Sequence, residues 1–102
     1  MNLEQITFKE VMNDGTAIHL YFQPKTGIYE AYGFSAFNLY RVAEQKSLQT
    51  IASYSVQVAM PVVQITKEQI QKLTSQQTET ISLKIDVPLN RDEYRIWTQK
   101  LK

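Results

Sequence analysis

The feature that most constrains the fold is a strict alternation of side chains over residues 17–23, followed at once by the turn sequence Pro-Lys-Thr-Gly at 24–27. A period of two is typical of a half-buried β-strand. Proline fixes φ and glycine accepts a positive φ, so the tetrapeptide can reverse the chain. The pattern predicts a β-hairpin whose second strand begins at Ile28, with Phe22 opposite Tyr29.

The residues before this hairpin also alternate, and we expect another strand there. Ile6 and Phe8 are separated by polar residues, and Asn13-Asp14-Gly15 can supply a turn. A three-residue loop of this kind would place Ile6 opposite Phe22 and Phe8 opposite Leu20.

The strand that begins at Ile28 is expected to run through Tyr32 towards Phe34. Two apolar phases meet at Ala36-Phe37, which predicts a bulge or bend. Residues 38–47 are compatible with either the end of a strand or a short helical turn.

Two later segments alternate as strands do, namely residues 48–58 and 81–87. Between them Pro61 is expected to end ladder pairing or to confine it to a sheet edge, because proline has no backbone N–H to donate.

Two helix starts carry capping signals. Thr66 with Gln69, and Asn90 with Glu93, have the spacing of a capping box. The second predicted helix ends the chain, and acidic residues in its first turn with lysines in its last complement the helix dipole. Its apolar stripe consists of Tyr94, Trp97 and Leu101.

These elements predict an α+β fold: a mainly antiparallel sheet of about five strands with two short helices on one face, the C-terminal helix last. A chain of 102 residues is long enough for one compact domain and too short for two, so we expect a single domain over residues 1–102.

Composition excludes several classes of site. The chain has no cysteine, one histidine and three glycines, which leaves no thiolate metal site, no two-histidine site and no phosphate-binding glycine loop. We therefore expect no metal and no cofactor. No apolar run reaches the ~20 residues that span a bilayer, and the N-terminus lacks the pattern of a secretory signal, so we expect a cytoplasmic protein without a membrane contact.

The net charge of +1 is too small for the positive field that non-specific nucleic-acid binding needs, and we expect no nucleic-acid partner. The alternative would require the C-terminal basic residues to join one stripe; these are Arg91, Arg95, Lys100 and Lys102.

The strand pairing above predicts a polar and aromatic patch on the sheet face opposite the core. Its members are Lys9, His19, Tyr21, Glu30 and Tyr32. Directly opposed side chains in a sheet stand ~5 Å apart, so these groups would be neighbours. Tyrosines supply large contact area at small entropic cost.

We therefore expect a small non-enzymatic interaction module that binds a protein partner or itself through this tyrosine-rich face. Self-association into a homo-oligomer is favoured because an open antiparallel sheet has edges to pair or cover. The alternative is a small enzyme of hydrolase or isomerase type in which His19 and Glu30 act as acid and base. A pocket around His19 would distinguish the enzyme from the module.

Overall fold

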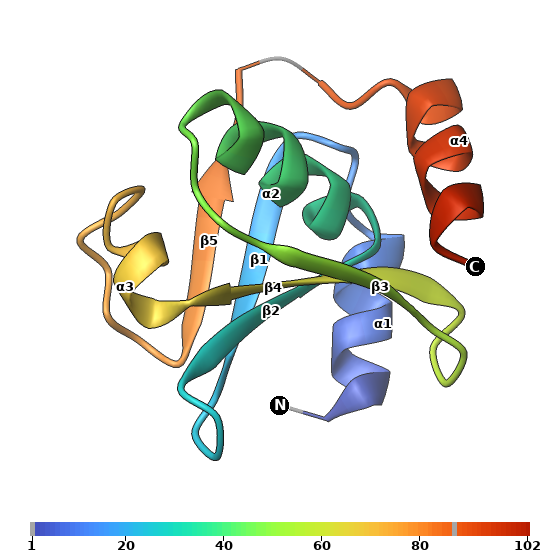
Figure 1. The fold of residues 1–102 in the computed structure, drawn as a ribbon. Helices are drawn as coiled ribbons and strands as arrows, with labels where there is room; N and C mark the ends of the chain where they lie inside the picture. The colour runs from blue at the N-terminus through green and yellow to red at the C-terminus, as the bar shows by residue number, and fades with distance from the viewer. Residues whose placement is uncertain (1, 87) are drawn as a thin grey trace.

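The computed structural model describes residues 2–86 and 88–102 and confirms the α+β class, with helices packed on a five-stranded antiparallel sheet (Figure 1). Along the chain the elements are α1 (Leu3–Val11), β1 (Ala17–Gln23), β2 (Ile28–Tyr32), α2 (Gly33–Gln45), β3 (Ile51–Ser55), β4 (Met60–Thr66), α3 (Lys67–Ile70), β5 (Thr80–Lys84) and α4 (Arg91–Leu101). The strand order is β3-β4-β2-β1-β5, and each neighbouring pair is antiparallel.

The predicted hairpin is present as β1 and β2, and Phe22 pairs with Tyr29 as expected. The turn between the strands closes with a hydrogen bond from the Gly27 N–H to the Gln23 carbonyl at 2.9 Å, and Gly27 has a φ of 70°. The prediction succeeded because the turn residues and the alternation specify the same register.

The expected strand before this hairpin is wrong, because residues 3–11 form helix α1. Its start is fixed by a capping box in which Asn2 Oδ1 accepts from the Gln5 N–H at 2.9 Å and Gln5 Oε1 accepts from the Asn2 N–H at 3.2 Å. The expected pairs of Ile6 with Phe22 and Phe8 with Leu20 are therefore absent. Strand β5 takes the place beside β1 instead.

The second correction concerns the segment after β2. The strand ends at Tyr32, and the expected extension to Phe34 with a bulge at Ala36-Phe37 is replaced by α2, which also takes up most of the undecided residues 38–47. Gly33 adopts a φ of 58°, a conformation that a strand cannot continue. Beyond it, the buried residues Ala36, Leu39 and Ala43 recur at helical spacing on one side of the chain.

The later strands are found with different limits. The 48–58 strand is shortened to β3, and a strand that the sequence analysis did not predict, β4, follows it. Pro61 lies within β4 and pairs with Tyr54 of β3, so it does not end pairing on that side, and β4 is not an edge strand. The ladder between β4 and β2 begins one residue later, at Val62, which places the proline at the end of that ladder.

Strand β5 covers the first part of the predicted 81–87 strand, and of that prediction Val87 lies outside the described residues. Both predicted helices are present on the same side of the sheet. Thr66 Oγ1 caps the single-turn α3, but the Gln69 Oε1 that would complete the capping box is buried without a partner. Asn90 Oδ1 caps α4 by accepting from the N–H groups of Asp92 and Glu93.

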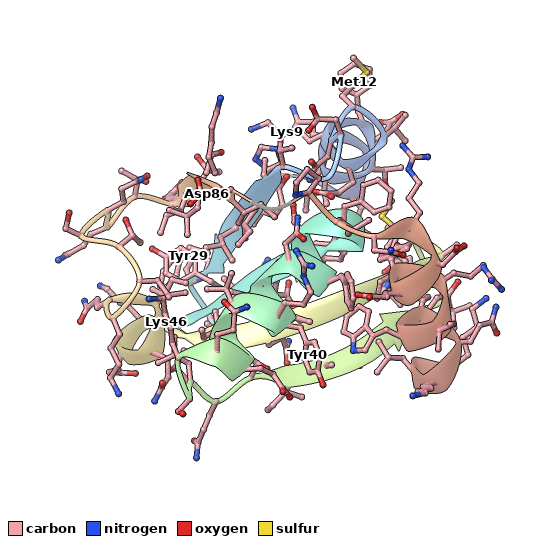
Figure 2. All side chains as sticks on the ribbon, turned by 90° about the horizontal axis from the view of Figure 1, so that it is seen from above. Lys9, Met12, Tyr29, Tyr40, Lys46 and Asp86 are labelled. Carbon is pink, nitrogen blue, oxygen red and sulfur yellow. The ribbon has the colours of Figure 1, made fainter. Side chains whose placement is uncertain are left out.

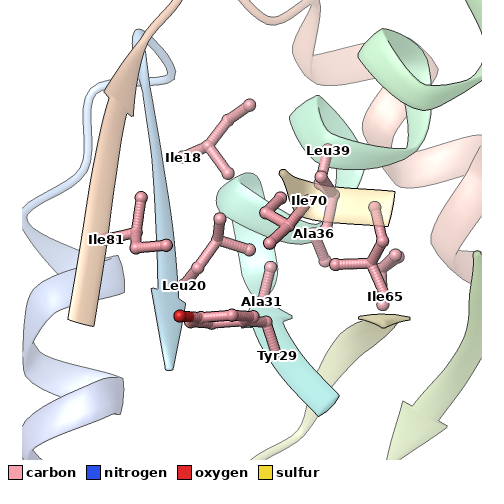
Figure 3. Packing of buried hydrophobic residues seen from close by; sticks show 10 residues of the cluster. Ile18, Leu20, Tyr29, Ala31, Ala36, Leu39, Ile65, Ile70 and Ile81 are labelled. Atoms are coloured by element: carbon pink, nitrogen blue, oxygen red, sulfur yellow. The ribbon is translucent and has the colours of Figure 1, made fainter. Parts of the chain in front are cut away.

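The main core lies between the sheet and the helices α2, α3 and α4. Figure 3 shows the side chains that converge there from β1, β2, β4, β5 and α2. Among its fully buried members are Ile18, Leu20, Tyr29, Leu39, Ile65, Ile70 and Ile81. Helix α4 closes this side through Trp97, whose ring packs 5.1 Å from that of Phe37 and 5.2 Å from that of Tyr40.

A second, smaller core occupies the opposite face of the sheet. It consists of Ile6 from α1 with Tyr21, Tyr32 and Val62 from three strands, and Leu3 and Met60 pack at its margin. Helix α1 therefore covers part of the face on which the sequence analysis placed the polar and aromatic patch.

Candidate functional site

Four of the five residues predicted to form a patch do share one face of the sheet. Tyr21 pairs directly with Glu30. The Tyr32 hydroxyl donates to Glu30 Oε1 at 3.1 Å, and the side-chain amide of Gln64 donates to Glu30 Oε2 at 2.8 Å. The Glu30 carboxylate is therefore held on both oxygens by neighbours on its own sheet.

This face is not open at its tyrosines, because α1 lies across them. Tyr21 is 3% exposed and Tyr32 7% exposed, and both pack against Ile6. Lys9 reaches the neighbourhood from α1 and not from an adjacent strand, so its expected place in a row of the sheet is corrected. In this conformation the tyrosine rings serve as a packing surface for α1.

His19 lies beside this second core and is partly buried. Its Nδ1 is 3.0 Å from the Ser82 hydroxyl on β5, and within the described residues no hydrogen bond joins it to Glu30. Partial burial, and secondarily the charge of Lys9, lowers the pKa of His19 below its ordinary value. This shift favours the neutral form of the imidazole, and Glu30 does not orient the ring.

The hydroxyl groups of Tyr21 and Tyr32 are weaker acids here than an ordinary tyrosine. Burial raises the pKa of Tyr21 to about 12, with a smaller contribution from the charge of Glu10. Burial and the neighbouring Glu30 likewise raise the pKa of Tyr32 to about 12. Neither group ionises near neutral pH, so neither can serve there as an anionic base.

A buried polar network fixes α1 to the rest of the fold. Glu10, in the last turn of α1, accepts from the Ser35 hydroxyl at 2.6 Å and from the Ser35 N–H at 3.1 Å. The Asn13 amide lies 3.2 Å from Glu10 Oε1 and 3.2 Å from the Ser35 hydroxyl. Burial raises the pKa of Glu10, and the hydrogen bonds from Ser35 partly oppose that rise.

With its inner side held this way, α1 turns an apolar side to solvent. Phe8 is 67% exposed, Val11 73% and Met12 69%. The three positions are spaced i, i+3 and i+4, so they form one patch on the helix side opposite Ile6. In Figure 2 Met12 stands at the outer margin of the molecule. We call these three residues the α1 patch.

Shallow hollows flank the α1 patch on both sides of Phe8. One, of about 540 Å³, lies between α1 and the turn that joins β3 to β4, and is lined by Leu3, Thr7, Val11 and Val58 among others. The other, of about 380 Å³, is lined by Glu4, Gln5 and Lys9 together with Phe8. The ring of Phe8 therefore forms a ridge between two grooves.

Sequence reasoning missed this surface because it assigned Ile6 and Phe8 to one side of a strand. The Asn2/Gln5 capping box was visible in the sequence. That signal predicts a helix, which separates Ile6 from Phe8, since residues two apart on a helix point to different sides.

The C-terminal basic residues do not form one stripe. Arg91 and Lys100 are nine positions apart, which at about 3.6 residues per turn places them on opposite sides of α4. The Arg91 guanidinium lies 5.6 Å from the centre of the Phe34 ring, and the Lys102 ammonium 5.1 Å from that of Tyr54. This arrangement supplies no argument for a nucleic-acid interface.

Two further features bear on the class of site. In residues 2–86 and 88–102 no group of three or more His, Asp or Glu side chains comes together in a way that could hold a metal ion. No helix in the described part of the chain is long and apolar enough to cross a membrane.

Comparisons with protein-family models, with curated proteins and with solved structures find no match for this chain.

Proposed function

We propose that this chain is a non-enzymatic interaction domain that pairs with a second copy of itself through the α1 patch. The observation that carries the proposal is the exposure of Phe8, Val11 and Met12 together on one side of a helix whose other side is anchored in the fold. Fully burying a side chain of this kind stabilises by about 1.5–3 kcal/mol, so leaving three neighbouring apolar side chains in contact with water forgoes a substantial stabilisation.

A second copy is the occupant that the shape of this surface favours. The Phe8 ridge and its flanking grooves belong to the same small area. Two identical surfaces related by a two-fold axis can each insert a ridge into the groove of the other, which is the self-complementarity that an isologous interface requires. Packing of helix ridges into grooves follows the same rule within a single chain.

The charges around the patch do not oppose this pairing. Glu4 and Lys9 flank Phe8 with opposite signs, and the whole chain carries a net charge of only +1. Identical surfaces therefore meet without an excess of like charge. The three side chains offer apolar area on the order of 300 Å², below the ~800 Å² per partner of a standard interface, so we expect a weak dimer.

This proposal keeps the interaction module expected from the sequence and moves its surface. The tyrosine-rich sheet face is replaced because α1 already covers Tyr21 and Tyr32. We place the domain in the cytoplasm, since a chain without cysteine suits a reducing compartment.

The test is the solution mass by light scattering, from about 1 μM to about 500 μM, a range that spans the dissociation constant of a weak dimer. We expect the mass to rise from that of a monomer towards that of a dimer. Phe8→Glu should remain monomeric throughout, because it places a carboxylate at the centre of the interface.

Ile96→Glu is the matched control, since Ile96 is 52% exposed on α4 and lies outside the α1 patch. It should dimerise like the unaltered chain. A monomer at the highest concentration would overturn self-association and direct the search to a different protein partner. A dimer that Phe8→Glu leaves intact would overturn the assignment of the surface.

A further inference from the structure

A separate hollow of about 710 Å³ lies at the edge of the sheet beside the start of β3, between the C-terminal half of α2 and the ends of β4 and α3. It exists because two ladders end at different places. The last pair between β3 and β4 is Ile51 with Gln64, whereas the ladder between β4 and β2 continues to Thr66. Residues 47–50, which connect α2 to β3, bridge the gap. Its volume falls within the range of small-molecule sites, about 300–1,000 Å³.

The walls of this hollow combine an apolar lining with acceptor groups. Ile65 is fully buried where it meets the hollow, and Leu48 and Ile51 line its sides. Glu44 stands one helical turn after Tyr40, and the proximity of its carboxylate raises the pKa of Tyr40. Figure 2 shows Tyr40 on α2, above the sheet.

Charge at the hollow has one sign. Among its described lining residues Glu44 is the charged one, and none is a lysine or an arginine. The lining also includes Gln69, whose Oε1 is buried with no hydrogen-bond donor. An unpaired buried acceptor is costly, and rotation of this amide towards a donor in the hollow would satisfy it. The site therefore provides acceptors and an anion, and lacks the cations that a carboxylate or phosphate ligand needs.

From this combination we infer that the hollow is a binding site for a primary ammonium group carried on an apolar chain. The alkyl chain lies against Leu48 and Ile51, and the ammonium lies at the Glu44 carboxylate with the Gln69 amide as a second acceptor. Such a group is found both in a free alkylamine and in the lysine side chain of a protein segment. The inference does not depend on the α1 patch, since the two sites share no residue.

The experiment is a titration of the ¹⁵N-labelled full chain followed by backbone amide shifts in NMR. The probes are n-hexylamine, which is protonated at pH 7, n-hexanoate, and an N-acetylated, C-amidated Ala-Lys-Ala tripeptide. We expect n-hexylamine to shift the amides of residues 44–51 and Gln69, with an affinity at least about fivefold above that of n-hexanoate. If the tripeptide shifts the same amides, the source is a lysine side chain, and if it does not, the source is a free amine.

Glu44→Gln should weaken n-hexylamine binding by about two- to fivefold and reduce the preference over n-hexanoate. Glu44 is exposed on α2, so the substitution leaves the core intact. Glu93→Gln on α4 is the matched control, and it should bind as the unaltered chain does. Equal shifts with n-hexanoate, no localised shifts with any probe, or an unchanged affinity in Glu44→Gln would each overturn the inference.

Discussion

The carboxylate of Glu10 caps the N-terminus of a helix other than its own. Ser35 is the third residue of α2, and its N–H, which has no partner within the helix, donates to Glu10 Oε1 at 3.1 Å. Tyr32, at the N-cap position, provides no side-chain cap. One contact between α1 and α2 therefore completes α2 and holds the helix that carries the α1 patch.

Replacing Glu10 tests this relationship. Glu10→Ala should lower the free energy of unfolding by about 2–4 kcal/mol, because it leaves the N–H and the hydroxyl of Ser35 buried without an acceptor. Glu10→Gln keeps one acceptor and should cost clearly less. Urea unfolding followed by circular dichroism measures both, and equal losses in the two variants would show that the Gln side chain restores none of the hydrogen bonds that Glu10 accepts.

The same carboxyl predicts a dependence on pH. Burial raises the pKa of Glu10 above 4.5 in the folded state, so the folded chain binds the proton more tightly than the unfolded chain. This contribution to stability is complete below pH 4.5 and is lost as the pH rises through the folded pKa. The stability of the unaltered chain relative to Glu10→Gln should therefore fall with rising pH and then level off. A stability difference between the two proteins that grew with pH would contradict the prediction. The titration of groups that both proteins share, such as Asp14, affects both stabilities equally and drops out of this difference.

Gly33 begins α2, and Gly27, in the turn between β1 and β2, is a control for the effect of a substitution at Gly33. Both have a positive φ, 58° and 70°. A Cβ on Gly33 would meet Met60 Sδ at 3.2 Å and Glu10 Oε1 at 3.4 Å, whereas a Cβ on Gly27 would meet nothing within 4 Å. Gly27→Ala should cost about 1 kcal/mol from backbone strain alone, and Gly33→Ala should cost more because it also presses on the Glu10 site. Denaturant titrations that ranked the two in the opposite order would contradict the packing argument.

The parts of the fold that could be predicted are those determined by residues close together in the sequence. The β1–β2 hairpin follows from one alternation and one turn, and the start of α4 from Asn90 and the acidic residues after it. Residues 3–11 were misassigned because Ile6 and Phe8, two positions apart, have the spacing of a strand with one buried face. That interpretation assumes that exposed positions are polar, and Phe8 violates the assumption.

The candidate surface depends on contacts that no local pattern contains. Glu10 and Ser35 are 25 positions apart, and their pairing follows only once α1 crosses the sheet and α2 turns at Gly33. The burial of Tyr21 and Tyr32 has the same origin, because the covering helix was itself assigned to a strand. The sequence pattern correctly predicted that Tyr21 and Tyr32 share one face of the sheet, but it did not predict that α1 covers them.

Asn90 provides a test of the C-terminal helix. Asn90→Ala removes the acceptor for two N–H groups in the first turn of α4 and should cost about 1 kcal/mol. Trp97 is the single tryptophan and packs on Phe37 and Tyr40, so its fluorescence during unfolding reports the docking of α4 directly. Gln99→Ala, at an exposed site near the other end of the helix, should change the stability by less than about 0.5 kcal/mol.

The two tyrosines beneath α1 should respond in opposite ways to removal of the hydroxyl group. The Tyr21 hydroxyl is buried without a partner, so Tyr21→Phe should leave the stability unchanged or raise it by about 1 kcal/mol. Tyr32→Phe breaks the hydrogen bond to Glu30 and should lower the stability by about 1 kcal/mol. Thermal and urea unfolding of the pair measures the sign, and ultraviolet titration of the unaltered chain should show two tyrosines ionising at about pH 12. A loss of stability in Tyr21→Phe as large as that in Tyr32→Phe would mean that the Tyr21 hydroxyl has a partner, which contradicts the packing of α1 described above.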